Sequence, residues 1–318
     1  MNTAPSTSTA QKAKPREDKV AFGIVLMSLA FLMFTLSDSS AKWLAGVGIA
    51  VVQVVFLRYF THLVMSLVVF IPRYGLKVFK SNAPKIQVLR ALFLFGSTVF
   101  NFLALKYLPI TVTVAIFFAM PIVVCLLSIP MLGERIGIRR FLAIVVGFVG
   151  VLVILQPWDA QFEWALLASL AALFCASLYM VLTRMIAGVD DNPTGQLYTS
   201  GVATLLIVGF AIPVWTWPAT ILDTVIACLI GVFAGIGHSM VTVAHRYAEA
   251  STLAPIVYVQ MLYVTVISWL VFSEPPDLWT LIGASIIIGS GLYIWLRERQ
   301  LRKQPTPLAP NKSVDGTS

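Results

Sequence analysis

Apolar runs of roughly 20 residues recur along almost the whole chain, and this feature limits the possible folds more than any other. A run of that length lets one α-helix cross the hydrocarbon core of a bilayer. Hydrophobic residues make up 58% of the 318 residues and charged residues 11%. A soluble domain of this length needs far more charge to cover its surface. The chain is therefore predicted to be an all-α membrane protein.

Ten of these runs are predicted to be transmembrane helices. In lipid, only a helix or a closed barrel satisfies its own backbone hydrogen-bonding groups. The runs are too evenly apolar for barrel strands, which alternate between apolar and polar residues. The predicted spans are 20–44, 49–71, 86–105, 110–132, 138–156, 163–183, 196–216, 221–244, 252–272 and 278–296.

The charged residues of the loops predict the orientation in the membrane. With the N-terminus inside, the cytoplasmic side carries most of the basic residues, from Arg73 and Lys77 to Arg302 and Lys303, whereas the outer loops carry acids such as Glu274. That asymmetry follows the positive-inside rule. Residues 1–19 and 297–318 are then two cytoplasmic tails of a multi-pass protein, placed in a bacterial inner membrane. The formal charge of +8 is explained by these loops, so no nucleic-acid partner is expected.

The sequence contains no motif that predicts an enzyme. It has no Walker A loop, no GxSxG elbow and no HExxH motif, and its three cysteines and three histidines lack metal-ligand spacing. We therefore predict neither a catalytic site, nor a metal site, nor a cofactor.

An internal repeat relates the two halves of the chain. A shift of 140 residues aligns Ala104-Leu-Lys-Tyr107 with Ala244-His-Arg-Tyr247, and Glu134 with Glu274. The two predicted copies span residues 20–156 and 163–296. Each copy has five spans, an odd number, so the copies must insert in opposite orientations. Inverted repeats of this kind are common in secondary transporters.

The motifs of both copies resemble the drug/metabolite transporter superfamily, in particular its ten-span branch with two EamA repeats. The first copy carries Ala104-Leu-Lys-Tyr107, Pro121, Gly133-Glu134-Arg135, Gly147 and Gly150-Val151, and the second carries Ala244, Ala254-Pro255, Glu274, Gly283 and Gly289. Met261 departs from the pattern, because this family often has proline there, so the second copy is expected to bend differently. The resemblance implies a secondary transporter that works by alternating access and hydrolyses no ATP.

Further residues resemble bacterial importers of riboflavin and of S-adenosylmethionine. They are Asp38-x-x-x-Lys42, Arg58-Tyr59, Leu89-Arg90, Pro109 and Leu132-Gly-Glu-Arg135. The resemblance implies a small-molecule solute, and we expect riboflavin or a similar heteroaromatic metabolite. Uptake of S-adenosylmethionine, or export of metabolites or drugs by the same fold, remains the alternative. A membrane enzyme or a scaffold is a third interpretation, and a homodimer is left open.

Arg58 is the first candidate for a substrate-binding or gating residue. It lies about nine residues into its span, which is roughly 13 Å below the outer face at 1.5 Å per residue. An arginine at that depth normally faces a cavity or a partner. Asp38 and Lys42 are one helical turn apart and are expected to pair with each other or to form an outer gate with Arg58.

The remaining candidates are polar and aromatic residues on spans three, four and nine. They are Asn101, Phe117, Phe118, Tyr258 and Gln260. Flat aromatic faces and polar atoms near a common midplane suit a planar ring, although ordinary helix packing also explains each residue taken singly.

Three other charged residues are given structural roles. Glu134 and Glu274 close spans four and nine and are expected to bind backbone N–H groups where the next helix begins. Arg90 is expected to be an anchor at the cytoplasmic face.

Overall fold

The computed structural model describes residues 17–132, 138–156, 163–186, 188–248 and 253–303, and the regular elements of these ranges are all helical. The predicted tails and Glu134 lie largely or wholly outside the described residues. The elements are α1 (Glu17–Gly46), α2 (Val51–Tyr74), η1 (Gly75–Phe79), α3 (Pro84–Leu105), α4 (Ile110–Phe117), α5 (Met120–Leu132), α6 (Ile138–Leu155), α7 (Ala165–Met185), α8 (Asn192–Ala211), η2 (Ile212–Val214), α9 (Ile221–Tyr247), η3 (Ala254–Val259), α11 (Gln260–Phe272) and α12 (Leu278–Lys303).

The helices have the length and composition of membrane spans. In the described ranges, seven segments are long and apolar enough to cross a membrane, and three shorter apolar helices cover Phe141–Leu155, Ile256–Phe272 and Leu278–Tyr293. Each of these ten segments overlaps one of the ten predicted spans, although the bounds differ by several residues. Large apolar side chains such as Leu205, Phe210 and Leu270 are exposed on the outside of the bundle, where lipid covers them in a membrane protein.

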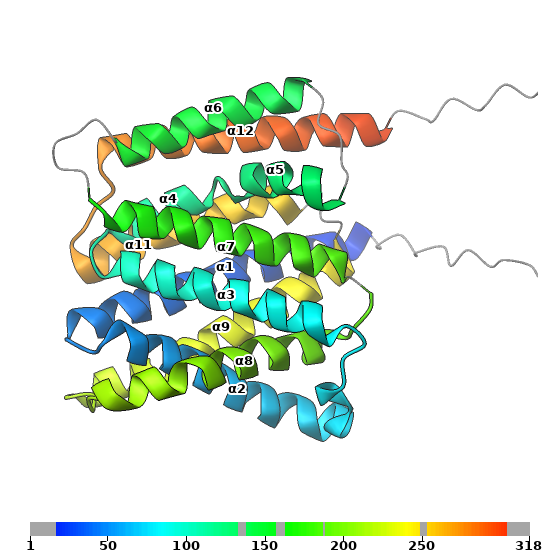
Figure 1. Ribbon diagram of the computed structural model, residues 1–318. Helices are drawn as coiled ribbons and strands as arrows, with labels where there is room; N and C mark the ends of the chain where they lie inside the picture. The colour runs from blue at the N-terminus through cyan, green and yellow to red at the C-terminus, as the bar shows by residue number, and fades with distance from the viewer. Residues whose placement is uncertain (1–16, 133–137, 157–162, 187, 249–252, 304–318) are drawn as a thin grey trace, which may run out of the picture.

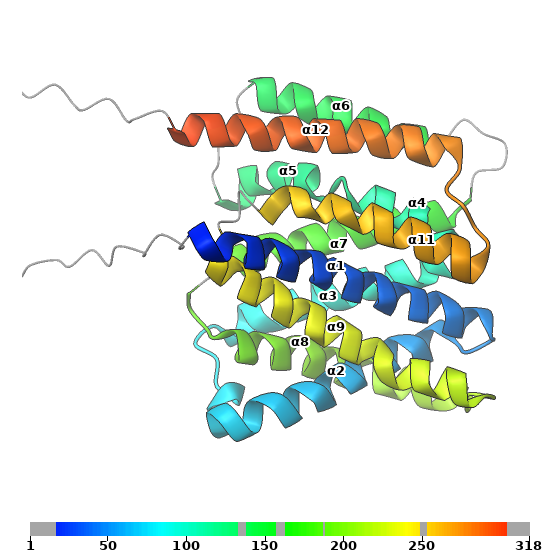
Figure 2. The same cartoon turned by 180° about the vertical axis from the view of Figure 1, so that it is seen from behind.

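The spans run side by side in one bundle. The paired helices α6 and α12 lie at one edge and α2 at the other, with α1, α3, α7 and α9 between them (Figure 1 and Figure 2). The first turn of α1 and the last turn of α12 lie at the same end, which we name the terminal end. We name the opposite end, where α1 meets α2 and α11 meets α12, the distal end.

The fourth and ninth spans are both interrupted near their middle. The fourth is divided into α4 and α5 at Phe118 and Ala119, just before Pro121. A proline fits the first turn of a helix, where its missing N–H needs no partner, but it breaks a helix interior. The ninth span begins as the 3₁₀-helix η3 and becomes α-helical at Gln260, although Met261 replaces the proline. The two spans therefore differ, because the fourth is divided into two α-helices, whereas the ninth changes from a 3₁₀-helix to an α-helix.

Glycines allow α6 and α12 to touch through their backbones. A Cβ atom added at Gly283 would lie 2.6 Å from the carbonyl oxygen of Gly150 and 2.5 Å from Ile154 Cγ1. A Cβ at Gly150 would lie 2.9 Å from the carbonyl oxygen of Gly283. Small residues bring membrane helices close where no hydrophobic effect drives their association. Two of the motif glycines found in the sequence thus have a packing role.

Substitution of Gly283 should separate this helix pair. Gly283→Ala places a methyl group against backbone atoms that cannot rotate away, and overpacking of this kind costs about 1–3 kcal/mol. We expect a lower thermal unfolding temperature in detergent and a lower abundance in the membrane. Gly289→Ala is the matched control, since no atom lies within 4 Å of a Cβ at that position of the same helix. Equal stability of the two variants would contradict the packing role.

Candidate functional site

Arg58 lies on α2 and faces α3, where polar and aromatic groups surround its guanidinium group. Its Nη1 donates a hydrogen bond of 2.6 Å to Thr98 Oγ1, and Thr98 also shares a hydrogen bond of 2.7 Å with the Tyr59 hydroxyl group. The guanidinium carbon is 5.3 Å from the centre of the Tyr59 ring and 5.6 Å from that of Phe102. Arg58 Nε is buried without a hydrogen-bond partner, so one donor of the guanidinium group is not satisfied by the protein.

Asp38 on α1 faces the same region of the bundle. Asn101 Nδ2 on α3 donates a hydrogen bond of 3.3 Å to Asp38 Oδ1. Asp38 keeps part of its surface accessible, and the charge of Arg58 acts on its carboxyl group without a direct ion pair between these two described residues. The structure thus brings together Asp38, Arg58 and Asn101, three of the residues selected from the sequence.

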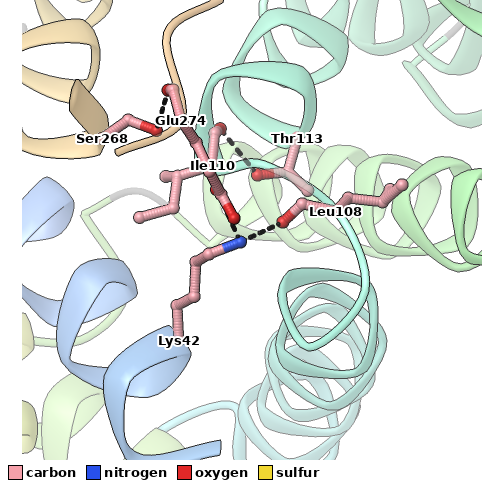
Figure 3. Close-up of polar contacts among 6 residues, drawn as sticks. All are labelled: Lys42, Leu108, Ile110, Thr113, Ser268 and Glu274. Carbon is pink, nitrogen blue, oxygen red and sulfur yellow. Dashed lines mark hydrogen bonds and ion pairs between the residues drawn. The ribbon is translucent and has the colours of Figure 1, made fainter. Parts of the chain in front are cut away.

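Lys42 lies one turn farther along α1, at the distal end, and its ammonium group joins three parts of the chain. Lys42 Nζ is 2.9 Å from Glu274 Oε2 and donates a hydrogen bond of 2.8 Å to the carbonyl oxygen of Leu108 (Figure 3). Glu274 follows α11, and its own carbonyl oxygen accepts a hydrogen bond from Ser268 Oγ. The ion pair therefore connects α1 with the segment after α11, and the hydrogen bond connects it with the segment before α4.

Two predictions from the sequence are corrected here. One of the two expectations for Lys42 was a pair with Asp38, but its long side chain reaches Glu274 and the carbonyl group of Leu108 before α4. Glu274 was expected to bind the backbone at the start of the next helix. Asp277 does so instead, accepting a hydrogen bond of 2.6 Å from the Thr280 N–H group. Sequence spacing could not reveal the partners of Lys42, since both are distant in the chain. Asp277, by contrast, lies three residues before Thr280, so its role was visible in the sequence.

Two further contacts hold the distal end together. Trp43 Nε1 donates a hydrogen bond of 2.8 Å to Asp223 Oδ1 in the first turn of α9. Gln53 donates to the Thr216 carbonyl oxygen at 2.7 Å and accepts from the Thr216 N–H group at 2.9 Å. Each contact joins the first half of the chain to the second.

A corresponding network joins the two halves at the terminal end. Asp190, in the segment between α7 and α8, accepts hydrogen bonds from Ser81 Oγ, from the Asn82 N–H group at 2.8 Å and from Gln87 Nε2 at 2.8 Å. Burial opposes ionisation of this carboxyl group, but the hydrogen bonds from Gln87, Ser81 and Asn82 outweigh it and lower the pKa of Asp190. A polar cavity of about 220 Å³ lies beside this network and is lined in part by Lys77 and Lys80.

Arg90 was expected to be an anchor at the cytoplasmic face, and this prediction is wrong. The residue is only 7% exposed, and its Nη2 donates a hydrogen bond of 3.0 Å to the carbonyl oxygen of Gly195 in α8. Its guanidinium group also lies over the ring of Tyr179 on α7, 5.4 Å from the ring centre. Arg90 Nε is buried without a hydrogen-bond partner. The position of Arg90 near the start of a span suggested an anchor, whereas the packing of α3 against α7 and α8 directs its side chain into the interior.

The aromatic candidates lie elsewhere in the bundle. The rings of Phe118 and Tyr258 meet edge to face with centres 5.4 Å apart, and Phe118 is almost fully buried. The Tyr258 hydroxyl group points at Gly291 of α12, where an added Cβ would lie 1.9 Å away. Phe117, the last residue of α4, and Gln260, the first residue of α11, are both half-buried. The contacts of Phe118 and Tyr258 are thus with each other and α12, and none of the described contacts links them to Arg58 or Asp38.

Residues that were not predicted to be site residues also contribute polar groups to the interior, although Tyr59 belongs to the motif Arg58-Tyr59. They are Tyr59, His62, Thr98, Gln196 and His238. His62 follows Arg58 by four residues and so lies on the same face of α2, which is a signal available from spacing alone. Among the described residues, no group of three His, Cys, Asp or Glu side chains could hold a metal ion.

The bundle of apolar helices defines a multi-span membrane protein, and comparisons with known proteins show that it is a transporter and give its family. The chain belongs to the EamA-like transporter family, whose sequence profile matches residues 21–156 and again residues 163–296. Proteins of this family are transporters, so the chain is not an enzyme.

Two relatives and one solved structure are similar over most of the chain. An S-adenosylmethionine uptake transporter of Rickettsia prowazekii is 27% identical, covering 87% of this chain and 94% of the relative. A riboflavin transporter of Rhizobium johnstonii is 24% identical, covering 90% of this chain and 95% of the relative. A crystal structure of a protein at 20% identity matches the fold with a TM-score of 0.59, covering 88% of this chain and 99% of the other.

Removal of the ion pair between Lys42 and Glu274 should loosen the distal end. Lys42→Met takes away both the partner of the Glu274 carboxylate and the donor to the Leu108 carbonyl oxygen. In a cysteine-free background, a cysteine placed at half-buried Asn101 should then react several-fold faster with maleimide in detergent.

The exposed Lys106, which ends the neighbouring helix, supplies the control Lys106→Met. The exchange Lys42→Glu with Glu274→Lys should return the labelling rate towards that of the parent. An unchanged rate in Lys42→Met would show that the pair does not close this end.

Proposed function

We propose that this transporter takes up riboflavin or a similar planar, polar heteroaromatic metabolite. The observation that supports the proposal is the site around Arg58, where a guanidinium group with an unsatisfied donor lies among the aromatic rings of Tyr59 and Phe102. Donors of this kind bind carbonyl and ring-nitrogen acceptors along the edge of a flavin, and flat side chains stack on its faces.

S-adenosylmethionine is the second candidate cargo, because relatives at similar identity carry that name and because Asp38 offers a carboxylate. The charges of the interior favour the first candidate. Among the described residues of the interior, two guanidinium groups are found, that of Arg58 and, nearer the terminal end, that of Arg90, against the carboxylate of Asp38. A cargo with a sulfonium and an ammonium group is repelled by that balance.

The proposed architecture is an inverted five-plus-five repeat, and helix packing supports it. If span n of the first half corresponds to span n+5 of the second, α1 corresponds to α7, and α3 corresponds to α9. The contact of α1 with α9 should then correspond to the contact of α7 with α3, and both contacts are extensive. The contact of α2 with α9 likewise corresponds to that of α8 with α3. The interrupted spans agree as well, because α5 begins at Met120 and α11 at Gln260, which are 140 residues apart.

In the proposed orientation, the terminal end is cytoplasmic and the membrane is the bacterial inner membrane. Basic residues such as Arg73, Lys77 and Lys80 lie at the terminal end, whereas Asp223 and Glu274 lie at the distal end. In a cysteine-free background, an impermeant thiol reagent added to cells should label Ala219→Cys and spare Lys77→Cys, both of which replace exposed residues. The reverse labelling pattern would overturn this orientation.

The contacts at the two ends suggest how access alternates. Opening towards the outside requires the ion pair of Lys42 with Glu274 and the contacts of Trp43 and Gln53 to separate. Opening towards the cytoplasm requires Asp190 to separate from the start of α3. Both sets join one half of the chain to the other, so a rocking motion of the halves can break one set at a time.

The cargo is tested by growth and uptake. A bacterial strain that cannot synthesise riboflavin and lacks its own importer should grow on low external riboflavin when it expresses this chain. Because Arg58 supplies the proposed anchor, Arg58→Ala should abolish uptake normalised to the amount of protein in the membrane. Arg58→Lys should restore little, since lysine lacks the planar fork of donors.

Two results would contradict the proposal. Uptake of S-adenosylmethionine without growth on riboflavin would transfer the assignment to the second cargo. Full normalised uptake by Arg58→Ala, or recovery of both abundance and uptake in Asp38→Asn with Arg58→Leu, would show that Arg58 has only a structural role.

A further inference from the structure

Two histidines face each other in the middle of the bundle, on α2 and α9. The rings of His62 and His238 are nearly parallel, with an interplanar angle of 8° and centres 6.1 Å apart. Gly235 permits this approach, because a Cβ atom there would lie 2.8 Å from His62 Cδ2. Neither histidine belongs to the group of residues around Arg58 and Asp38 described above.

His62 is fixed by a chain of hydrogen bonds that crosses three helices. Its Nε2 is 3.1 Å from Gln196 Oε1, and Gln196 Nε2 donates to Ser239 Oγ at 3.2 Å. Ser239 Oγ in turn donates to the Gly235 carbonyl oxygen at 2.8 Å, so it accepts from Gln196 and sets the orientation of the amide. With the amide oxygen facing the ring, His62 Nε2 must carry the hydrogen. The Nε2 atom of His62 is therefore occupied by Gln196, and the His62 ring packs against His238.

His238 is held in place but keeps its polar atoms available. The Phe34 ring on α1 packs against it in an edge-to-face arrangement with centres 5.0 Å apart, while its other ring neighbour is His62. The side chain is half-buried, and neither ring nitrogen forms a hydrogen bond with any described residue. A polar side chain within a membrane span usually faces a partner or a cavity, and here the protein supplies no partner.

The charges around His238 are positive. Arg58 from the distal side and Arg90 from the terminal side both lie close enough for their charges to act on it. Among the described residues, no carboxylate forms an ion pair or hydrogen bond with His238. A solute at this position meets donors, a flat ring and positive charge.

We propose that His238, supported by His62, Gln196 and Phe34, is a second solute-binding residue, and that it recognises an acceptor-rich edge of a heteroaromatic ring that is neutral or anionic. The inference rests on the proposed transport function and adds to it the class of solute. A solute passing from Arg58 towards Arg90 would exchange one set of hydrogen-bond donors for the next, with His238 between them.

The test measures binding to the purified wild-type chain and its variants by titration. His238→Phe keeps an aromatic ring against Phe34 and His62 but has no ring nitrogen, and His238→Asn keeps a donor and an acceptor. The control is His245→Phe, which changes an exposed histidine two turns along the same helix. The probes are riboflavin and adenine, which are neutral, flavin mononucleotide, which is anionic, and S-adenosylmethionine, which is cationic.

We expect His238→Phe to raise the Kd for riboflavin about tenfold, as loss of one hydrogen bond in a buried site does. His238→Asn should raise it less, and His245→Phe should leave it unchanged. His238→Met replaces the Phe variant if thermal unfolding shows that the latter is not folded.

The outcomes separate this inference from the cargo assignment. If the wild type does not bind riboflavin but binds another neutral or anionic probe, and His238→Phe weakens that binding, the cargo assignment fails and the inference stands. Unchanged binding in His238→Phe, binding of S-adenosylmethionine alone, or binding of no probe would overturn the inference.

Discussion

The cost of placing a charged group inside a membrane protein organises the interior of this transporter. A guanidinium group in hydrocarbon is expensive unless it is solvated by polar or aromatic groups. Arg58 obtains a hydroxyl group from Thr98 and the faces of two rings, and Arg90 obtains the Gly195 carbonyl group and the ring of Tyr179. In both cases the Nε donor remains without a partner. The protein thus compensates each charge only in part, and the proposed solute would bind the donor that Arg58 leaves unsatisfied.

Close packing of the helices stabilises the bundle in which Arg58 and Arg90 lie. In lipid, the association of helices depends on van der Waals contact and on polar bonds between them. Gly150 and Gly283 let α6 and α12 touch, and Gly235 lets α9 approach α2 close to His62. Interruptions in the fourth and ninth spans then place irregular backbone in the middle of the bundle, where neighbouring helices surround it.

Polar contacts at both ends of the bundle join the two halves of the chain. At the distal end, one ion pair and several hydrogen bonds join the halves, and at the terminal end a single carboxylate, Asp190, collects three donors. All of them are local polar contacts of side chains and loops, which can separate without unfolding a helix. In the proposed mechanism, the apolar contacts within the bundle remain while one end opens, and this combination fits the proposed inverted repeat.

The sequence by itself determined the class of protein. Ten apolar runs without the alternation of barrel strands require transmembrane helices, because the backbone must satisfy itself in lipid. The motif residues also sufficed to identify the family that the sequence profile then gave, and the depth of Arg58 in its span marked it as a residue facing the interior. These conclusions depend on local properties, namely composition, run length and position along one helix.

Only the tertiary structure decided which side chains meet. Lys42 pairs with Glu274, 232 positions away in the chain, and not with Asp38 one turn away. Arg90 faces the interior and not the cytoplasmic surface, and His62 meets His238 from a helix in the other half. The rotation of each helix about its axis and the order of helices in the bundle fix these contacts. Both follow from packing over the whole chain, and an evenly apolar span carries little periodic signal from which either could be read.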